Sequence, residues 1–174
     1  MKKLLTTAAF AVLFSILSFA QLPLEGTWCM SQTFFGTTVA DYMIFENNTG
    51  GKVTNKLVIN MKMTVAGAKV TGDAEIALEG TFTAEGDKVT IKWDQDTRKV
   101  TQKPMEVNYK GEKIDEDFSD CDEIFTELIQ ETEEEIKTAD VDEFYNVKVK
   151  NDKLFMTSKD EKGKAETDKF TRVK

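Results

Sequence analysis

The chain has 174 residues, with 31 acidic against 23 basic side chains and a formal net charge of −8 at pH 7. A surface of this sign repels phosphate backbones and anionic lipid headgroups, so we expect no nucleic-acid partner. Histidine is absent, which excludes Ser-His-Asp catalysis, Cys-His catalysis and histidine-bound metal. We expect neither an enzyme nor a bound cofactor.

Residues 1–20 have the pattern of a signal peptide. A basic start, Lys2-Lys3, precedes a largely apolar run to Leu17, and Ser18-Phe19-Ala20 supplies the small residues that a signal peptidase reads. An N-terminal anchor helix is the alternative, but the run is shorter than the roughly 20 apolar residues that span a bilayer. We expect cleavage after this tripeptide, a secreted or periplasmic location, no stable membrane insertion and one domain over residues 21–174.

Alternating side chains predict the first strands, over residues 26–33, 41–46 and 53–65. In the third of these, apolar residues hold odd positions and polar residues hold most even ones, so one face is buried and the other is wet. Asn55 and Val58 are the exceptions, since the first is a polar residue at an odd position and the second an apolar residue at an even one. The apolar residues are Val53, Leu57, Ile59, Met61, Met63 and Val65.

The same alternation predicts three more strands, over residues 69–82, 88–93 and 105–110. Gly86-Asp87 supplies a tight turn between the first two, and Pro104 places the third at an edge or marks its start. Their apolar positions are Val70, Ala74, Ile76, Leu78 and Phe82, then Val89, Ile91 and Trp93, then Met105, Val107 and Tyr109.

The period then changes to that of an amphipathic helix, near residues 115–138. Apolar residues recur there at intervals of three and four between acidic positions, and acidic residues in the first turns suit the positive end of the helix dipole. The recurring residues are Ile114, Phe118, Cys121, Phe125, Leu128, Thr132 and Ile136. Three final strands follow, over residues 144–150, 153–158 and 167–173.

The predicted fold class is all-β, an up-and-down antiparallel β-barrel of about eight or nine strands with one helix before the final strands. All the strands share a single apolar face, and one helix is too small to cover an open sheet of that width. Closing the sheet on itself covers the face and pairs the edges. A two-sheet sandwich is the alternative, and the short sequential connections favour the barrel.

Two motifs give the chain a resemblance to lipocalins. Gly26-Thr27-Trp28 opens the first strand as the Gly-x-Trp signature does in that family, and Arg172 ends the last strand where lipocalins place an arginine. The segment Phe45–Gly50 is similar to small lipocalin-like (calycin-like) proteins exported by Bacteroides-type bacteria. The resemblance implies that the Arg172 guanidinium lies over the Trp28 ring and closes the barrel; the helix differs in position, because lipocalins carry theirs after the last barrel strand.

The two cysteines, Cys29 and Cys121, suggest a disulfide, because both remain after export to an oxidising compartment. Cys29 alternates with Trp28 and would point outward, and Cys121 lies on the apolar face of the helix. If the helix packs on the outside of the barrel, a bridge would clamp it to the first strand. Two buried free thiols are the alternative.

The inward face predicts the function. A barrel of this size either fills its interior or holds one small ligand, and a methionine-rich apolar lining suits a small hydrophobic molecule. The alternative is a solid, packed barrel core in a protein that binds another protein through its surface. The predicted ligand-binding residues are Met30, Ile59, Met61, Met63, Ile76, Leu78, Ile91, Trp93, Met105 and Tyr109.

Overall fold

The computed structural model of the chain describes residues 22–109, 117–138, 142–159 and 162–174. The predicted signal peptide and the first two residues of the predicted helix lie outside the described residues. The described chain forms one sheet of nine strands and one helix. The elements are β1 Gly26–Phe34, β2 Thr37–Phe45, β3 Gly50–Val65, β4 Ala68–Glu85, β5 Lys88–Gln102, β6 Glu106–Tyr109, α1 Ser119–Thr138, β7 Asp142–Lys150, β8 Lys153–Lys159 and β9 Ala165–Arg172.

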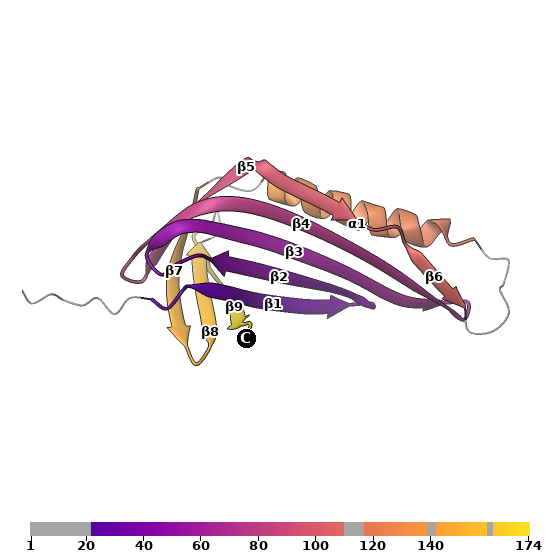
Figure 1. Cartoon of the computed structure of the whole chain (residues 1–174), viewed down its shortest axis with the longest axis horizontal. Coiled ribbons are helices and arrows are strands. Elements are labelled where there is room, and N and C mark those ends of the chain that lie inside the picture. Colours follow the sequence, from indigo (N-terminus) through magenta and orange to yellow (C-terminus); the bar gives the residue numbers. More distant parts are fainter. Residues whose placement is uncertain (1–21, 110–116, 139–141, 160–161) are drawn as a thin grey trace, which may run out of the picture.

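Eight of the strands form a closed ring (Figure 1). Each pairs antiparallel with the next, in the order β1-β2-β3-β4-β5-β7-β8-β9, and β9 pairs back onto β1. The short β6 pairs with the start of β4. This arrangement confirms the predicted up-and-down barrel with a helix before the final strands, since a closed sheet covers its apolar face and leaves few edges.

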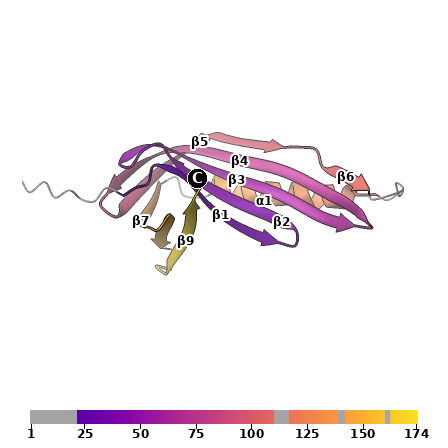
Figure 2. The same cartoon turned by 60° about the horizontal axis from the view of Figure 1, so that its bottom comes forward.

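The ring is closed along only part of the strands. β3 and β4 have 16 and 18 residues, whereas β7, β8 and β9 have 9, 7 and 8. β1 and β9 share only the pairs Trp28↔Arg172 and Cys29↔Thr171 among the described residues. Beyond this closed segment the longer strands continue as an open, curved sheet with α1 along it (Figures 1 and 2). The molecule is a short barrel with a sheet projecting from its mouth.

Two apolar cores share the inner face of the sheet. The barrel core contains Leu24, Trp28, Met43, Phe45, Val53, Leu78, Phe82, Val89, Ile91, Trp93, Val147, Leu154, Met156 and Phe170. The helix-covered core contains Ile59, Met61, Ala68, Val70, Ala74, Phe118, Phe125 and Ile129. On β4, the members of both cores have even numbers, so they point to the same side of the strand. The helix therefore packs on the face that lines the barrel.

Gly72 on β4 allows this close packing of α1. A side chain at Gly72 would place its Cβ atom 2.8 Å from the ring of Phe125, which is fully buried. The helix begins at Ser119, whose backbone N–H donates to the Asp117 carboxylate at 2.9 Å. This N-terminal cap lowers the pKa of the Asp117 carboxyl group. No helix among the described residues has the length and apolar composition needed to cross a membrane.

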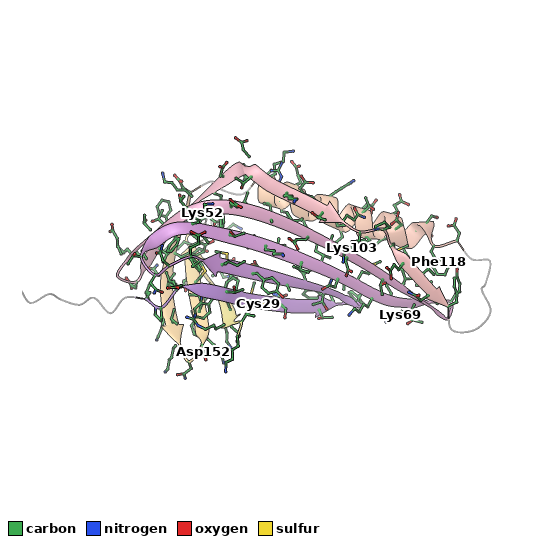
Figure 3. All side chains as sticks on the ribbon, viewed as in Figure 1. Cys29, Lys52, Lys69, Lys103, Phe118 and Asp152 are labelled. Atoms are coloured by element: carbon green, nitrogen blue, oxygen red, sulfur yellow. The ribbon has the colours of Figure 1, made fainter. Side chains whose placement is uncertain are left out.

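The position of α1 separates the two cysteines. Trp28 is buried in the barrel, so Cys29 faces the outer side of β1, whereas Cys121 packs against the helix-covered core. In Figure 3, Phe118, one turn before Cys121, lies at the end of the sheet far from Cys29. Both cysteines are free thiols. The predicted Cys29–Cys121 disulfide is therefore absent, because it required the helix to pack on the outside of the first strand.

Candidate functional site at the barrel mouth

One end of the barrel is blocked by Trp28 and Arg172. The Arg172 guanidinium carbon lies 4.2 Å from the centre of the Trp28 ring, the contact that the sequence predicted. Its two terminal nitrogens donate to the backbone carbonyls of Glu25 at 2.7 Å and Pro23 at 2.6 Å. The indole N–H of Trp28 donates to the carbonyl of Leu24 at 2.6 Å. These contacts hold the segment before β1 against the barrel core, so this end gives a ligand no access.

The ten predicted ligand-binding residues do not line one cavity. Leu78, Ile91 and Trp93 belong to the barrel core, and Met30 packs against it. Ile76 is buried on the same face of β4. Five others belong to the helix-covered core or pack against it: Ile59, Met61, Met63, Met105 and Tyr109. Alternation identified the inner face correctly, but it carries no information on how far along each strand the barrel extends.

A cavity of about 170 Å³ lies at the open end of the barrel core, and we call it the mouth cavity. Its apolar wall is made of barrel-core side chains, including Leu78 and Trp93 of the predicted set, and Ile136 near the end of α1 completes it. Its polar wall comes from five strands, β2, β3, β5, β7 and β9. The lining residues are Asp41, Met43, Asn55, Leu78, Trp93, Gln95, Ile136, Glu143, Tyr145, Met156, Asp168 and Phe170.

Much of the polar wall forms because the inner face of four strands changes from apolar to polar side chains near the mouth of the barrel. Side chains two positions apart share a face of a strand. Each of these polar residues therefore lies on the inner face, two positions from an apolar residue and nearer the mouth. The steps are Met43 to Asp41 on β2, Val53 to Asn55 on β3, Trp93 to Gln95 on β5 and Phe170 to Asp168 on β9. Asn55 was the one signal of this wall in the sequence, as a polar residue on an apolar face.

Hydrogen bonds fix the polar side chains of the mouth cavity. The Asn55 amide donates to Asp41 Oδ1 at 2.6 Å. Glu143 Oε2 accepts two hydrogen bonds, from the Trp93 indole at 2.6 Å and from the Tyr145 hydroxyl at 2.8 Å. The wall is therefore organised before any ligand arrives, which reduces the entropy lost on binding.

A bulge in β5 links the mouth cavity to the helix. Between Ala77 and Glu79 of β4 the β4–β5 register shifts, so β5 carries extra residues there. One of them, Gln95, donates to the carbonyl of Ile136 at 3.1 Å. Another, Arg98, donates to Gln95 at 3.3 Å and to Glu133 of α1 at 3.2 Å. The bulge therefore holds the end of α1 over the barrel mouth.

Burial changes the acidity of the groups in this site. It raises the pKa of Asp41 to about 6, against the hydrogen bond from Asn55, and the nearby Asp168 and Glu143 add to the rise. Burial also raises the pKa of Asp168, with a contribution from Glu166. The pKa of Tyr145 is raised by burial and by the charge of Glu143. The site thus shields the carboxyl groups of Asp41 and Asp168 from water, and the negative charges of neighbouring carboxylates raise their pKa further.

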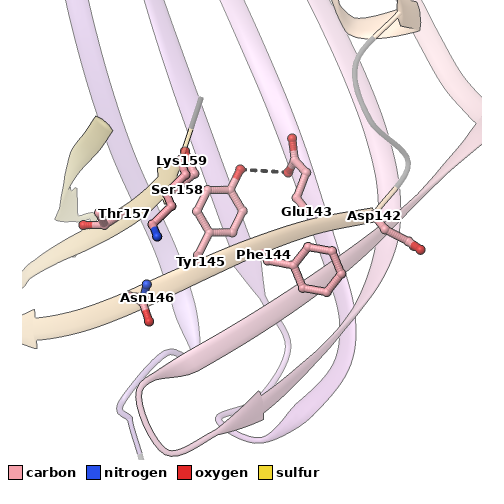
Figure 4. A pocket seen from close by; sticks show the side chains of 8 residues that line it. All are labelled: Asp142, Glu143, Phe144, Tyr145, Asn146, Thr157, Ser158 and Lys159. Atoms are coloured by element: carbon pink, nitrogen blue, oxygen red, sulfur yellow. Dashed lines mark hydrogen bonds between the residues drawn. The ribbon is translucent and has the colours of Figure 1, made fainter. Parts of the chain in front are cut away.

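A groove of about 470 Å³ lies beside the mouth cavity, between β7 and β8 (Figure 4). The β7–β8 pairing stops at Asn146↔Thr157, so Glu143 and Tyr145 lie beyond the last paired residues. Both also line the mouth cavity. Figure 4 shows them on one side of β7, with Phe144 on the other. The groove and the mouth cavity share this wall. A ligand in the mouth cavity could therefore enter through the groove or extend into it.

The groups in the mouth cavity suit binding. Among the described residues, no three acidic or cysteine side chains are arranged to hold a metal ion. The oxygen atoms of Asp41, Glu143 and Asp168 offer acceptors for a ligand that donates hydrogen bonds. No protein-family model matches the chain, and no curated protein matches it.

Proposed function

We propose that the protein is an exported, lipocalin-like, non-enzymatic barrel that binds one small molecule with an apolar body in its mouth cavity. The observation that carries the proposal is the cavity itself, which has an apolar wall of core residues and a pre-organised polar wall. Export rests on the signal-peptide pattern of residues 1–20.

The size of the cavity limits the ligand. Sites for drug-sized molecules occupy about 300–1,000 Å³, and the mouth cavity has about 170 Å³. The ligand is therefore small, or only its apolar part enters the cavity while the rest lies in the groove between β7 and β8. Because Trp28 and Arg172 block the other end, the ligand enters from the side of α1 or of the groove.

Native mass spectrometry of protein purified from the exported fraction, followed by solvent extraction, tests this proposal. We expect a bound small molecule in the wild type and in Asp96→Trp, whose side chain is exposed. We expect none in Gln95→Trp, which puts the same large side chain into the mouth cavity. A wild type that is empty and takes up no added apolar compound would contradict the proposal.

A second candidate is a protein-binding module with a packed barrel interior. It is favoured by Phe34 and Phe35 at the β1–β2 turn, which are 58% and 100% exposed. Apolar aromatic side chains on a surface are typical of contacts between proteins. A cross-linked partner that is lost in a Phe34→Ser, Phe35→Ser variant, together with an empty cavity, would support this candidate.

A further inference from the structure

The mouth cavity brings together three carboxyl groups without a basic side chain. Asp41, Glu143 and Asp168 lie on β2, β7 and β9, and all three line the cavity. None of the described residues that line it is lysine or arginine. Like charges that share a partly buried site repel one another. The folded protein therefore carries an unfavourable interaction at this point that a positively charged ligand would relieve.

Eight carboxylates elsewhere among the described residues lie within 4.0 Å of a basic side chain. On the outside of the sheet, Glu75 lies 2.7 Å from Lys56, and Asp73 lies 3.6 Å from Lys103. On α1, Glu133 lies 3.2 Å from Arg98. None of the described residues in the cavity wall is basic, although the chain has 23 basic residues. The cation that complements the wall has to come from outside the chain.

The hydrogen bonds leave defined acceptors free in the cavity. Glu143 Oε2 already accepts from Trp93 and Tyr145, and Asp41 Oδ1 accepts from Asn55. Asp41 Oδ2 and the Asp168 carboxylate accept no hydrogen bond from another described residue. An ammonium group has donors and no acceptor, so it suits this pair of carboxylates.

The rest of the wall selects an organic cation over a metal ion. No group of three or more described acidic or cysteine side chains is placed to hold a metal ion, whereas Met43, Leu78 and Met156 form an apolar surface for a carbon skeleton. Trp93 adds an aromatic ring of the kind that attracts a cation. We infer that the mouth cavity binds a small primary amine in its protonated form, with the ammonium group at Asp41 and Asp168 and a compact apolar body against the barrel core.

This inference rests on the proposed function and is tested with three probes that share one ring. Benzylamine, benzyl alcohol and benzoate are titrated into the intact protein by isothermal titration calorimetry at pH 8, where Asp41 is ionised. We expect benzylamine to bind at least about tenfold more tightly than benzyl alcohol, and benzoate not to bind, because a charged donor forms a stronger hydrogen bond with a carboxylate than a neutral donor does.

Charge-removing variants assign the effect to the named residues. Asp41→Asn and Asp168→Asn keep the shape of the side chain, and each is expected to weaken benzylamine about tenfold without changing benzyl alcohol. Asp96→Asn removes an exposed charge outside the cavity and should change neither. Circular dichroism confirms that each variant is folded.

The outcomes separate the two proposals. If benzylamine and benzyl alcohol bind equally well, or if neither Asp41→Asn nor Asp168→Asn weakens benzylamine, the ligand is not selected as a cation. The proposal that the cavity binds a small molecule would remain. If none of the three probes binds, and extraction of the native protein yields no small molecule, the cavity is not a binding site and both proposals fail.

Discussion

Asp41 is a carboxyl group held in a site that disfavours its charge. Burial raises its pKa from 3.8 to about 6, so the folded protein binds this proton more tightly than the unfolded chain does. The stability that protonated Asp41 contributes is present below about pH 4 and is lost as the pH rises through about 6. A shift of this size corresponds to about 3 kcal/mol.

The Asp41→Asn variant, which does not titrate, should show this linkage. Relative to wild type, its free energy of unfolding should rise by about 2–3 kcal/mol between pH 4 and pH 7, because only the wild type acquires the buried charge. Urea denaturation at the two pH values measures the difference. Asp96→Asn is the exposed control. A difference between Asp41→Asn and wild type that is the same at both pH values would show that Asp41 titrates normally.

The residue scale is also where prediction from sequence failed for the site. Asp41 and Asp168 lie at points where no long alternation identifies the inner face, so nothing in the sequence separates them from surface acids. Glu143 falls outside the predicted strand 144–150, although β7 begins at Asp142. Only Asn55, inside the strongest alternating segment, marked the wall. A polar interruption of a long apolar face is thus a better guide to a barrel site than the apolar residues themselves.

At the scale of elements, the helix and the sheet touch where β4 has no side chain. Gly72 lies against the Phe125 ring, which is fully buried. The amphipathic pattern predicted the helix and the buried Phe125, but it did not include Ile129, which is also buried. It could not predict that the helix packs on the inner face of the sheet, because alternation does not show where the closed barrel ends and that face becomes accessible to the helix.

Gly72→Ala is expected to lower the free energy of unfolding by about 1–3 kcal/mol, because the added methyl group overpacks the helix-covered core. In the Phe125→Leu background, where the smaller side chain leaves space, Gly72→Ala should lower the free energy of unfolding by less. Urea denaturation of the four proteins in this double-mutant cycle measures the coupling. Additive effects would mean that residue 72 does not contact the helix.

At the scale of the whole molecule, the alternation predicted a single closed sheet, and the first and last strands pair as expected. The predicted contact between Trp28 and Arg172 is present because these residues occupy the first and last strands, which must meet if the sheet closes. Alternation could not show that the barrel is short. That depends on β7, β8 and β9 being about half as long as β3 and β4.

Arg172→Ala should therefore destabilise the whole molecule. The variant loses the contact with the Trp28 ring and two hydrogen bonds to backbone carbonyls, and we expect a loss of about 2–3 kcal/mol. Lys169→Ala, on the exposed side of the same strand, is the control and should change stability little. If both variants lose the same amount, closure does not depend on the guanidinium.

The two-pair junction between β1 and β9 has a consequence for how the chain folds. The Arg172–Glu25 hydrogen bond joins residues 147 positions apart. The other junctions of the ring join strands that follow one another, except that β5 pairs with β7 across β6 and α1. Contacts between neighbours in sequence form early, and those that close a long loop form late. The hairpins of the sheet are therefore expected to form first, and the pairing of β1 with β9 to form last. Until that step its first strand stays unpaired on one side, and this interval is when the chain is most exposed to aggregation.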